Sequence, residues 1–288
     1  MRLSTKAIVV LGSLALVAAA ATTTGPSSKN VPRGLPVYLA LGDSWAYGQG
    51  ATDPAEDGYV GLVADELRET VDCHPGVAEQ KPKACKRLRL ANLARPATEE
   101  LPGVTAEIVA GEQLPIAIPM LEAHNQDRNR HNDVLLVTLQ VGGNDVTGPI
   151  REACIGGFTP ECGATWFAEM AQFETDLDQV VAELRTAAGS TTPIVLGTYD
   201  NPVPYCELSA IPGAIELGAM VLEGTPDGSL DGIHDVVRRV ADRYNARVAE
   251  IFGSLQQDDF VGGEDCLHIT DTGHAEVART FLEVIEET

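Results

Sequence analysis

A serine stands directly after a short apolar segment near the start of the chain. The segment runs from Val37 and ends in Leu41-Gly42-Asp43-Ser44. A serine hydroxyl is a weak nucleophile at neutral pH. It attacks a carbonyl only when a base accepts its proton and donors hold the oxyanion that forms. Serine is also a common N-cap residue, so this segment alone leaves open whether Ser44 is a nucleophile or only caps the following helix.

A second polar segment follows the most apolar run of the sequence. There Gly142-Gly143-Asn144-Asp145 comes directly after residues 134–139. The amide of Asn144 is a neutral donor. It suits an oxyanion hole because it stabilises developing negative charge at any working pH and does not first have to be protonated. The alternative is a turn-forming asparagine that bonds its own backbone.

A third segment near the C-terminus contains an acid and a base. Asp265 precedes His268 by three residues, a spacing that lets the acid reach one imidazole nitrogen on a tight turn or a helical start. The other nitrogen is then free to act as base. Asp271 and His274 repeat the spacing, but His274 falls inside a predicted helix, so we expect it to pack and predict His268 as the base. The other histidines are expected at the surface: His74, His124, His131 and His234.

The elements that position these residues alternate between strand and helix. Apolar runs predict strands at 37–41, 87–93, 134–139 and 194–198, and apolar periodicity predicts helices at 58–71, 173–188, 233–244 and 271–286, the last capped by Thr270. This alternation indicates an α/β protein with a mostly parallel sheet covered on both faces. Sites in such folds form at the carboxyl ends of strands. The proline-rich stretch 201–231 is predicted to be an irregular excursion that shapes the substrate groove.

The three segments together resemble the conserved blocks of the GDSL, or SGNH, hydrolase family. Leu41–Ser44 is similar to its first block, Gly142–Asp145 to its third, and Asp265–His268 to its last. The blocks stand in the family's order over nearly the whole chain. The resemblance implies a flavodoxin-like three-layer α/β/α sandwich. It also implies ester hydrolysis that uses no metal and no cofactor, with an oxyanion hole built from backbone N–H groups and an asparagine.

On this resemblance, Ser44 is the predicted nucleophile, His268 the base and Asp265 the acid that orients it, although a backbone carbonyl could take that last role. The predicted oxyanion hole consists of the Ser44 N–H, the Asn144 amide and the N–H of Ala97.

Two positions depart from the family pattern. Trp45 stands where a leucine is common, and Ala97 lies in the second block, where the family places a glycine. A backbone donor does not require glycine when its φ is negative, so the hole can survive this change. Asp43 is expected to order the turn.

The N-terminal segment predicts export. Arg2 and Lys6 precede an apolar run that ends at Ala21, which is typical of a secretory signal peptide over residues 1–21. An uncleaved membrane anchor is the alternative, although the run is short for a span. We expect a flexible leader at 22–35 and one hydrolase domain at 36–288 in a secreted, monomeric protein.

Six cysteines lie beyond the signal segment, and in an exported chain an even number indicates disulfides. Sequential pairing is predicted: Cys73–Cys85, Cys154–Cys162 and Cys206–Cys266. The last pair would hold the loop of His268 in place. Metal binding is the less favoured alternative, because the sequence has no Cys-x-x-Cys and no histidines at ligand spacing.

The net charge of −22 disfavours nucleic acid and anionic membrane surfaces as partners. The sequence also lacks the Gly-x-Ser-x-Gly elbow, a phosphate-binding loop and a zinc-protease helix. The expected partner is therefore a small-molecule, lipid or carbohydrate ester, cleaved by a general esterase or lipase. Two alternatives remain: a carbohydrate O-deacetylase with the same machinery, and a secreted binding module that has lost the chemistry.

Overall fold

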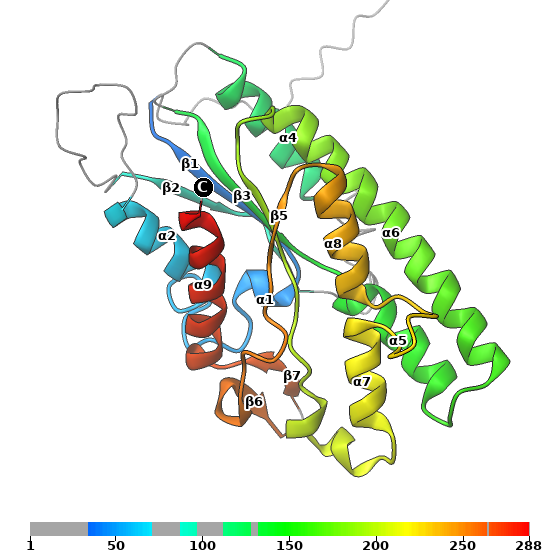
Figure 1. Ribbon diagram of the computed structural model, residues 1–288. Coiled ribbons are helices and arrows are strands. Elements are labelled where there is room, and N and C mark those ends of the chain that lie inside the picture. Colours follow the sequence, from blue (N-terminus) through cyan, green and yellow to red (C-terminus); the bar gives the residue numbers. More distant parts are fainter. Residues whose placement is uncertain (1–33, 71–86, 97–111, 128–131, 264, 288) are drawn as a thin grey trace, which may run out of the picture. The chain divides into compact units, whose positions relative to one another are not determined.

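A five-stranded parallel sheet lies at the centre of the protein (Figure 1). The computed structural model describes residues 34–70, 87–96, 112–127, 132–263 and 265–287. The strands are β1 (Val37–Gly42), β2 (Arg89–Asn92), β3 (Val134–Gln140), β4 (Ile194–Gly197) and β5 (Arg247–Ala249). Their order is β2-β1-β3-β4-β5, and every pairing is parallel. This is the flavodoxin-like order, in which the direction of winding reverses between β1 and β3.

The central strands are apolar because both of their faces are covered. Every residue of β1 is buried, and β3 is buried except at Leu135. A strand with helices above and below it has no solvent face, so its sequence reads as a continuous apolar run instead of an alternating one. One polar pair is tolerated in this core because its members bond each other, with the Tyr38 and Thr138 hydroxyls 2.9 Å apart.

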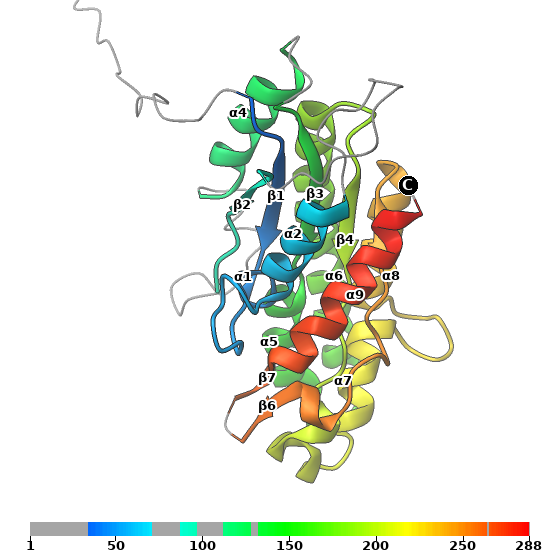
Figure 2. The ribbon, with the colours of Figure 1, turned by 90° about the vertical axis from the view of Figure 1, so that its left-hand side faces the viewer.

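Helices form a layer on each side of the sheet (Figures 1 and 2). One layer contains α2 (Tyr59–Thr70) and α9 (Asp271–Glu286), which pack against each other. The other contains α4 (Leu114–Asn125), α6 (Pro160–Ala188) and α8 (Ile233–Arg243). The predicted three-layer α/β/α sandwich is therefore confirmed.

Most predicted elements are present, with their ends shifted by one or two residues. The last helix has the predicted bounds, and Thr270 caps it by accepting the N–H of Gly273 at 3.4 Å. The predicted helix at 173–188 is only the second half of α6, which has 29 residues. Several elements were not predicted from the sequence: α1 (Ser44–Tyr47), α4, α5 (Gly143–Cys154), the three-residue strand β5, and the antiparallel hairpin of β6 (Phe260–Gly262) and β7 (Asp265–Ile269).

The excursion at 201–231 is more regular than predicted. It contains the 3-10 turns η1 (Val203–Tyr205) and η2 (Glu207–Ala210) and the α-helix α7 (Ala214–Glu223). The prolines and glycines that suggested irregularity flank α7, and its ten residues include only one glycine, Gly218.

Several predictions lie outside the described residues. These concern the signal peptide at 1–21, most of the leader, Ala97, the pair Cys73–Cys85, and the predicted surface positions of His74 and His131. In the part of the chain that the structure describes, no helix is both long enough and apolar enough to cross a membrane.

Candidate active site

Ser44 is the first residue of α1 (Ser44–Tyr47), a single turn that begins where β1 ends. The backbone turns sharply at Gly42, whose φ is +146° and where a Cβ atom would lie 2.5 Å from the carbonyl oxygen of Gln140. Only glycine fits this position. Asp43 then caps the turn by accepting the N–H of Trp45 at 3.0 Å. Ser44 is left at the carboxyl edge of the sheet, with 8% of its surface exposed.

The carboxyl group of Asp43, the residue before Ser44, is buried. Its second oxygen accepts the Tyr199 hydroxyl at 2.5 Å. Burial raises the pKa of Asp43 to about 7, and the nearby charge of Asp145 adds to this, while the bonds from Tyr199 and Trp45 pull the other way. Both oxygens are held by the protein, which agrees with the expectation that Asp43 orders the turn.

Asn144 is placed by the neighbouring strand. It lies in the first turn of α5 (Gly143–Cys154), which begins just after β3. The turn between them requires Gly142, whose φ is +125° and where a Cβ atom would lie 2.7 Å from the ring of Phe173. Since β1 and β3 flank the point where the winding reverses, Ser44 and Asn144 come together at the edge where this fold forms its sites.

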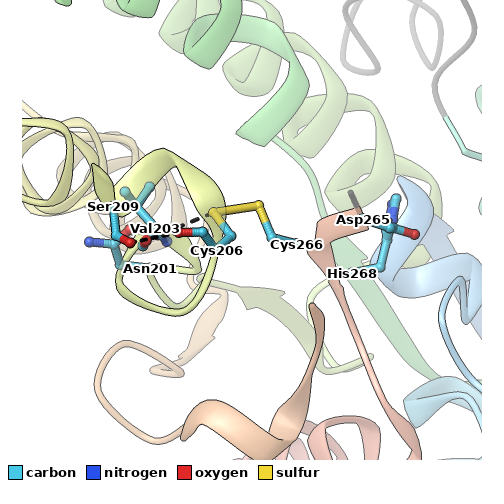
Figure 3. The surroundings of a disulfide bond; sticks show 7 residues. All are labelled: Asn201, Val203, Cys206, Ser209, Asp265, Cys266 and His268. Atoms are coloured by element: carbon cyan, nitrogen blue, oxygen red, sulfur yellow. Dashed lines mark hydrogen bonds and ion pairs between the residues drawn. A yellow bond between two sulfur atoms is a disulfide. The ribbon is translucent and has the colours of Figure 1, made fainter. Parts of the chain in front are cut away.

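His268 and Asp265 lie on β7, outside the main sheet. The Nδ1 atom of His268 is 2.6 Å from a carboxylate oxygen of Asp265. The two residues were expected to meet on a tight turn or a helical start, but they meet along a strand instead (Figure 3). The partner of Nδ1 is the carboxylate and not a backbone carbonyl. The imidazole is mostly covered, at 16% exposure, whereas the Asp265 side chain is 47% exposed.

Trp45, the residue after Ser44, is bonded to the strand that carries His268. Its indole N–H donates to the carbonyl of Leu267 at 2.9 Å, next to His268. Its ring also meets that of Tyr199 edge-on, with centroids 5.3 Å apart. A leucine could not make the first contact. The departure from the family pattern at Trp45 thus has a structural role that the sequence did not indicate.

A disulfide joins the same strand to the excursion. Cys206, between η1 and η2, pairs with Cys266 of β7, two residues before His268 (Figure 3). A second disulfide joins Cys154, the last residue of α5, to Cys162 in α6. Both pairs coincide with the expected ones, although the second connects two helices where loops were expected.

His274 packs inside the protein, as expected from its place in the last predicted helix. It is completely buried, its Nδ1 accepts the N–H of Tyr59 at 3.3 Å, and its Nε2 lies 3.2 Å from the carbonyl of Gln49. One nitrogen accepting and the other donating describes a neutral imidazole. Burial is the main cause that lowers the pKa of His274, to about 4.

The prediction that His234 and His124 lie at the surface is wrong, because both are buried. His234 accepts the N–H of Tyr199 at 3.0 Å and contacts Glu223 through its other nitrogen. The hydrogen bond from His234 is the main cause that lowers the pKa of Glu223 to about 2. The sequence did contain an indication of this burial. His234 lies three residues before Val237, which places both on the apolar face of α8.

One cavity of about 420 Å³ brings the predicted residues together. Ser44, Asn144 and His268 all line it, and Asp265 adjoins it through His268. Ala97 lies outside the described residues, although its neighbour Pro96 lines the cavity. Within the described ranges, no three His, Cys, Asp or Glu side chains are placed to hold a metal ion.

A sequence model of the GDSL-like lipase/acylhydrolase family matches residues 40–276. The chain belongs to this family. Membership places the protein among the carboxylic ester hydrolases and confirms the resemblance seen in the three sequence blocks. No curated protein sequence gave a significant match.

Solved structures share the fold of this GDSL-like hydrolase at low sequence identity. An extracellular lipase from Streptomyces rimosus is 18% identical with a TM-score of 0.51, over 88% of this chain and 99% of that one. A lipase from a goat rumen metagenome is 16% identical with a TM-score of 0.55, over 86% and 97%. An acetylxylan esterase from Geobacillus stearothermophilus is 16% identical with a TM-score of 0.50, over 88% and 95%. At such identities the likeness concerns the fold alone.

Proposed function

We propose that this hydrolase cleaves carboxylic esters through an acyl-enzyme formed on Ser44. The observation that carries the proposal is the shared cavity, which has a serine hydroxyl, an imidazole and a neutral amide on its wall. These are the nucleophile, base and oxyanion donor that acyl transfer needs. Each comes from a different element, so the arrangement depends on the whole fold.

The reaction proceeds in two steps. His268 takes the proton of Ser44 through Nε2 as the hydroxyl oxygen attacks the ester carbonyl, and then gives that proton to the leaving alcohol. Water next attacks the acyl-enzyme with His268 again as base, which releases the acid and restores Ser44.

Asp265 orients the base. By accepting the Nδ1–H of His268 it fixes the tautomer that leaves Nε2 free, and it stabilises the imidazolium as that charge forms. Since nearly half of the Asp265 side chain is exposed, solvent screens its charge. Orientation is therefore its larger contribution.

The oxyanion is held by the backbone N–H of Ser44 and by the side-chain amide of Asn144. Both residues stand in the first turn of a helix, where backbone N–H groups lack partners within the helix and the local potential is positive. A third donor near Ala97 remains a prediction from the sequence.

We also propose that the protein is exported. The predicted signal segment, the two disulfides and the similarity of fold to an extracellular lipase support this. Disulfides persist in oxidising compartments and are rare in the cytosol.

The proposal is tested by replacing the nucleophile. Ser44→Ala should lower the hydrolysis of p-nitrophenyl esters by roughly 10⁴-fold or more, because removing a triad member leaves only binding and the oxyanion donors. Ser190→Ala is the matched control, since Ser190 is exposed and does not line the cavity. Retained turnover in a folded Ser44→Ala protein would refute the proposal.

A further inference from the structure

The cavity extends beyond the catalytic groups into an apolar chamber. Its walls there come from η2, from α7 and from the end of α5, through the aliphatic side chains of Leu208, Leu217, Val221, Leu222 and Ile155. The same cavity includes Ser44, so a group attached to the reacting carbonyl can reach this chamber without crossing protein. The volume of about 420 Å³ falls in the roughly 300–1,000 Å³ range of small-molecule sites.

The buried polar side chains of the chamber are already bonded within the protein. Asp200 accepts the N–H groups of Asn201 and Leu255, each at 2.7 Å. Asn201 accepts the N–H of Val203 at 3.1 Å and donates to the carbonyl of Ile215 at 3.2 Å. These bonds hold the excursion in shape. Away from the catalytic groups, the other polar side chains on the lining are half-buried or exposed, and they belong to Gln49, Thr147 and Arg151.

The two aromatic residues of the cavity are bonded in the same way. Trp45 gives its indole N–H to Leu267, and Tyr199 gives its hydroxyl hydrogen to Asp43. A sugar placed in the buried part of the chamber would need buried polar groups free to pair with its hydroxyls, because an unpaired buried hydroxyl costs free energy. What Trp45 and Tyr199 offer a ligand is apolar ring surface.

We propose that this chamber binds the acyl chain of the substrate, so that the protein favours esters of medium-length and longer fatty acids over acetate esters. The inference rests on the proposed function, because it assumes that the ester carbonyl lies at Ser44. An acetyl group would leave the aliphatic walls facing water. Each methylene that a longer chain adds is transferred from water to those walls, which corresponds to roughly fourfold in kcat/KM until the chamber is filled.

The test is a series of p-nitrophenyl acetate, butyrate, hexanoate and octanoate with the full protein. The expected kcat/KM rises along the series, with octanoate at least about tenfold above acetate. Acetylated xylooligosaccharides serve as the competing substrate class.

Variants then locate the effect in the chamber. Ile155→Asn and Leu208→Asn place a polar amide on two different walls, and each should lower the ratio of octanoate to acetate kcat/KM by at least about fourfold, the value of one methylene. Ile116→Asn is the matched control, because Ile116 is 47% exposed on α4 and does not line the cavity, whereas Ile155 is 37% exposed and does. The control should leave the ratio unchanged.

The outcomes separate the two proposals. If the wild-type protein hydrolyses acetate or sugar acetates at least as well as octanoate, the acyl-chain inference is overturned while the proposed function stands. The same holds if the Ile155 and Leu208 variants keep the wild-type ratio. If the wild-type protein hydrolyses none of these esters, the proposed function itself fails.

Discussion

Asp43 and His274 should give the stability of this protein two opposing dependences on pH. In the folded state the pKa of Asp43 is about 7, against an ordinary value of 3.8. Between these values the folded protein binds a proton that the unfolded chain does not, so the free energy of unfolding falls as the pH rises. For His274 the folded pKa is about 4 and the ordinary value 6.5. There the unfolded chain binds the extra proton, so the free energy of unfolding rises with pH.

Single substitutions separate the two effects. Each group contributes a slope of at most about 1.4 kcal/mol per pH unit, and over roughly pH 4 to 6.5 the slopes nearly cancel. Asp43→Asn keeps an oxygen that can cap α1 but removes the titration. Relative to wild type, this variant should therefore lose about 3 kcal/mol of unfolding free energy as the pH falls from 6.5 to 4. His274→Gln should show the opposite trend.

Urea unfolding monitored by tryptophan fluorescence at pH 4, 5, 6 and 7 measures these differences, because groups that titrate equally in the variant and the wild type cancel. The two variants control for each other. For each, the difference in unfolding free energy from wild type is plotted against pH, and the two slopes must have opposite signs. A difference between Asp43→Asn and wild type that stays constant over this range would refute the reasoning.

Further predictions concern the oxyanion hole and the disulfides. Asn144→Ala should lower kcat by roughly 10²–10³ without changing the urea midpoint, because one oxyanion donor is lost from the cavity wall and no core side chain is changed. A kcat within threefold of wild type would argue against this role. Replacing Cys206 and Cys266 by serine opens a loop of 60 residues and should cost about 4 kcal/mol, whereas the same change at Cys154 and Cys162, 8 residues apart, should cost about 2.5. Only the first pair should also lower kcat, since it holds the strand of the base.

The half of the site built on the main sheet could be predicted from the sequence. The apolar runs that become β1 and β3 are long enough to show that both faces are buried, and a parallel sheet then brings their carboxyl ends together. Ser44 and Asn144 follow those ends directly. Their positions are thus consequences of local pattern and chain topology.

The other half depends on tertiary contacts that leave no local pattern. His268 lies on a short hairpin outside the sheet, held there by Trp45 and by the Cys206–Cys266 disulfide. The three-residue spacing of Asp265 and His268, together with the family block, pointed to this residue, whereas the strand-end rule could not. Strands of three residues, such as β5, are too short to show a period, and α7 was hidden by the glycines and prolines that flank it.

The most direct test of the central claim is to map the covalent adduct of a fluorophosphonate probe, which reacts with an activated serine. After digestion, mass spectrometry should find the adduct on the peptide that contains Ser44, and both the adduct and ester turnover should be absent from Ser44→Ala. Ester turnover by a protein that carries the adduct on another serine, or that the probe does not label, would contradict the account.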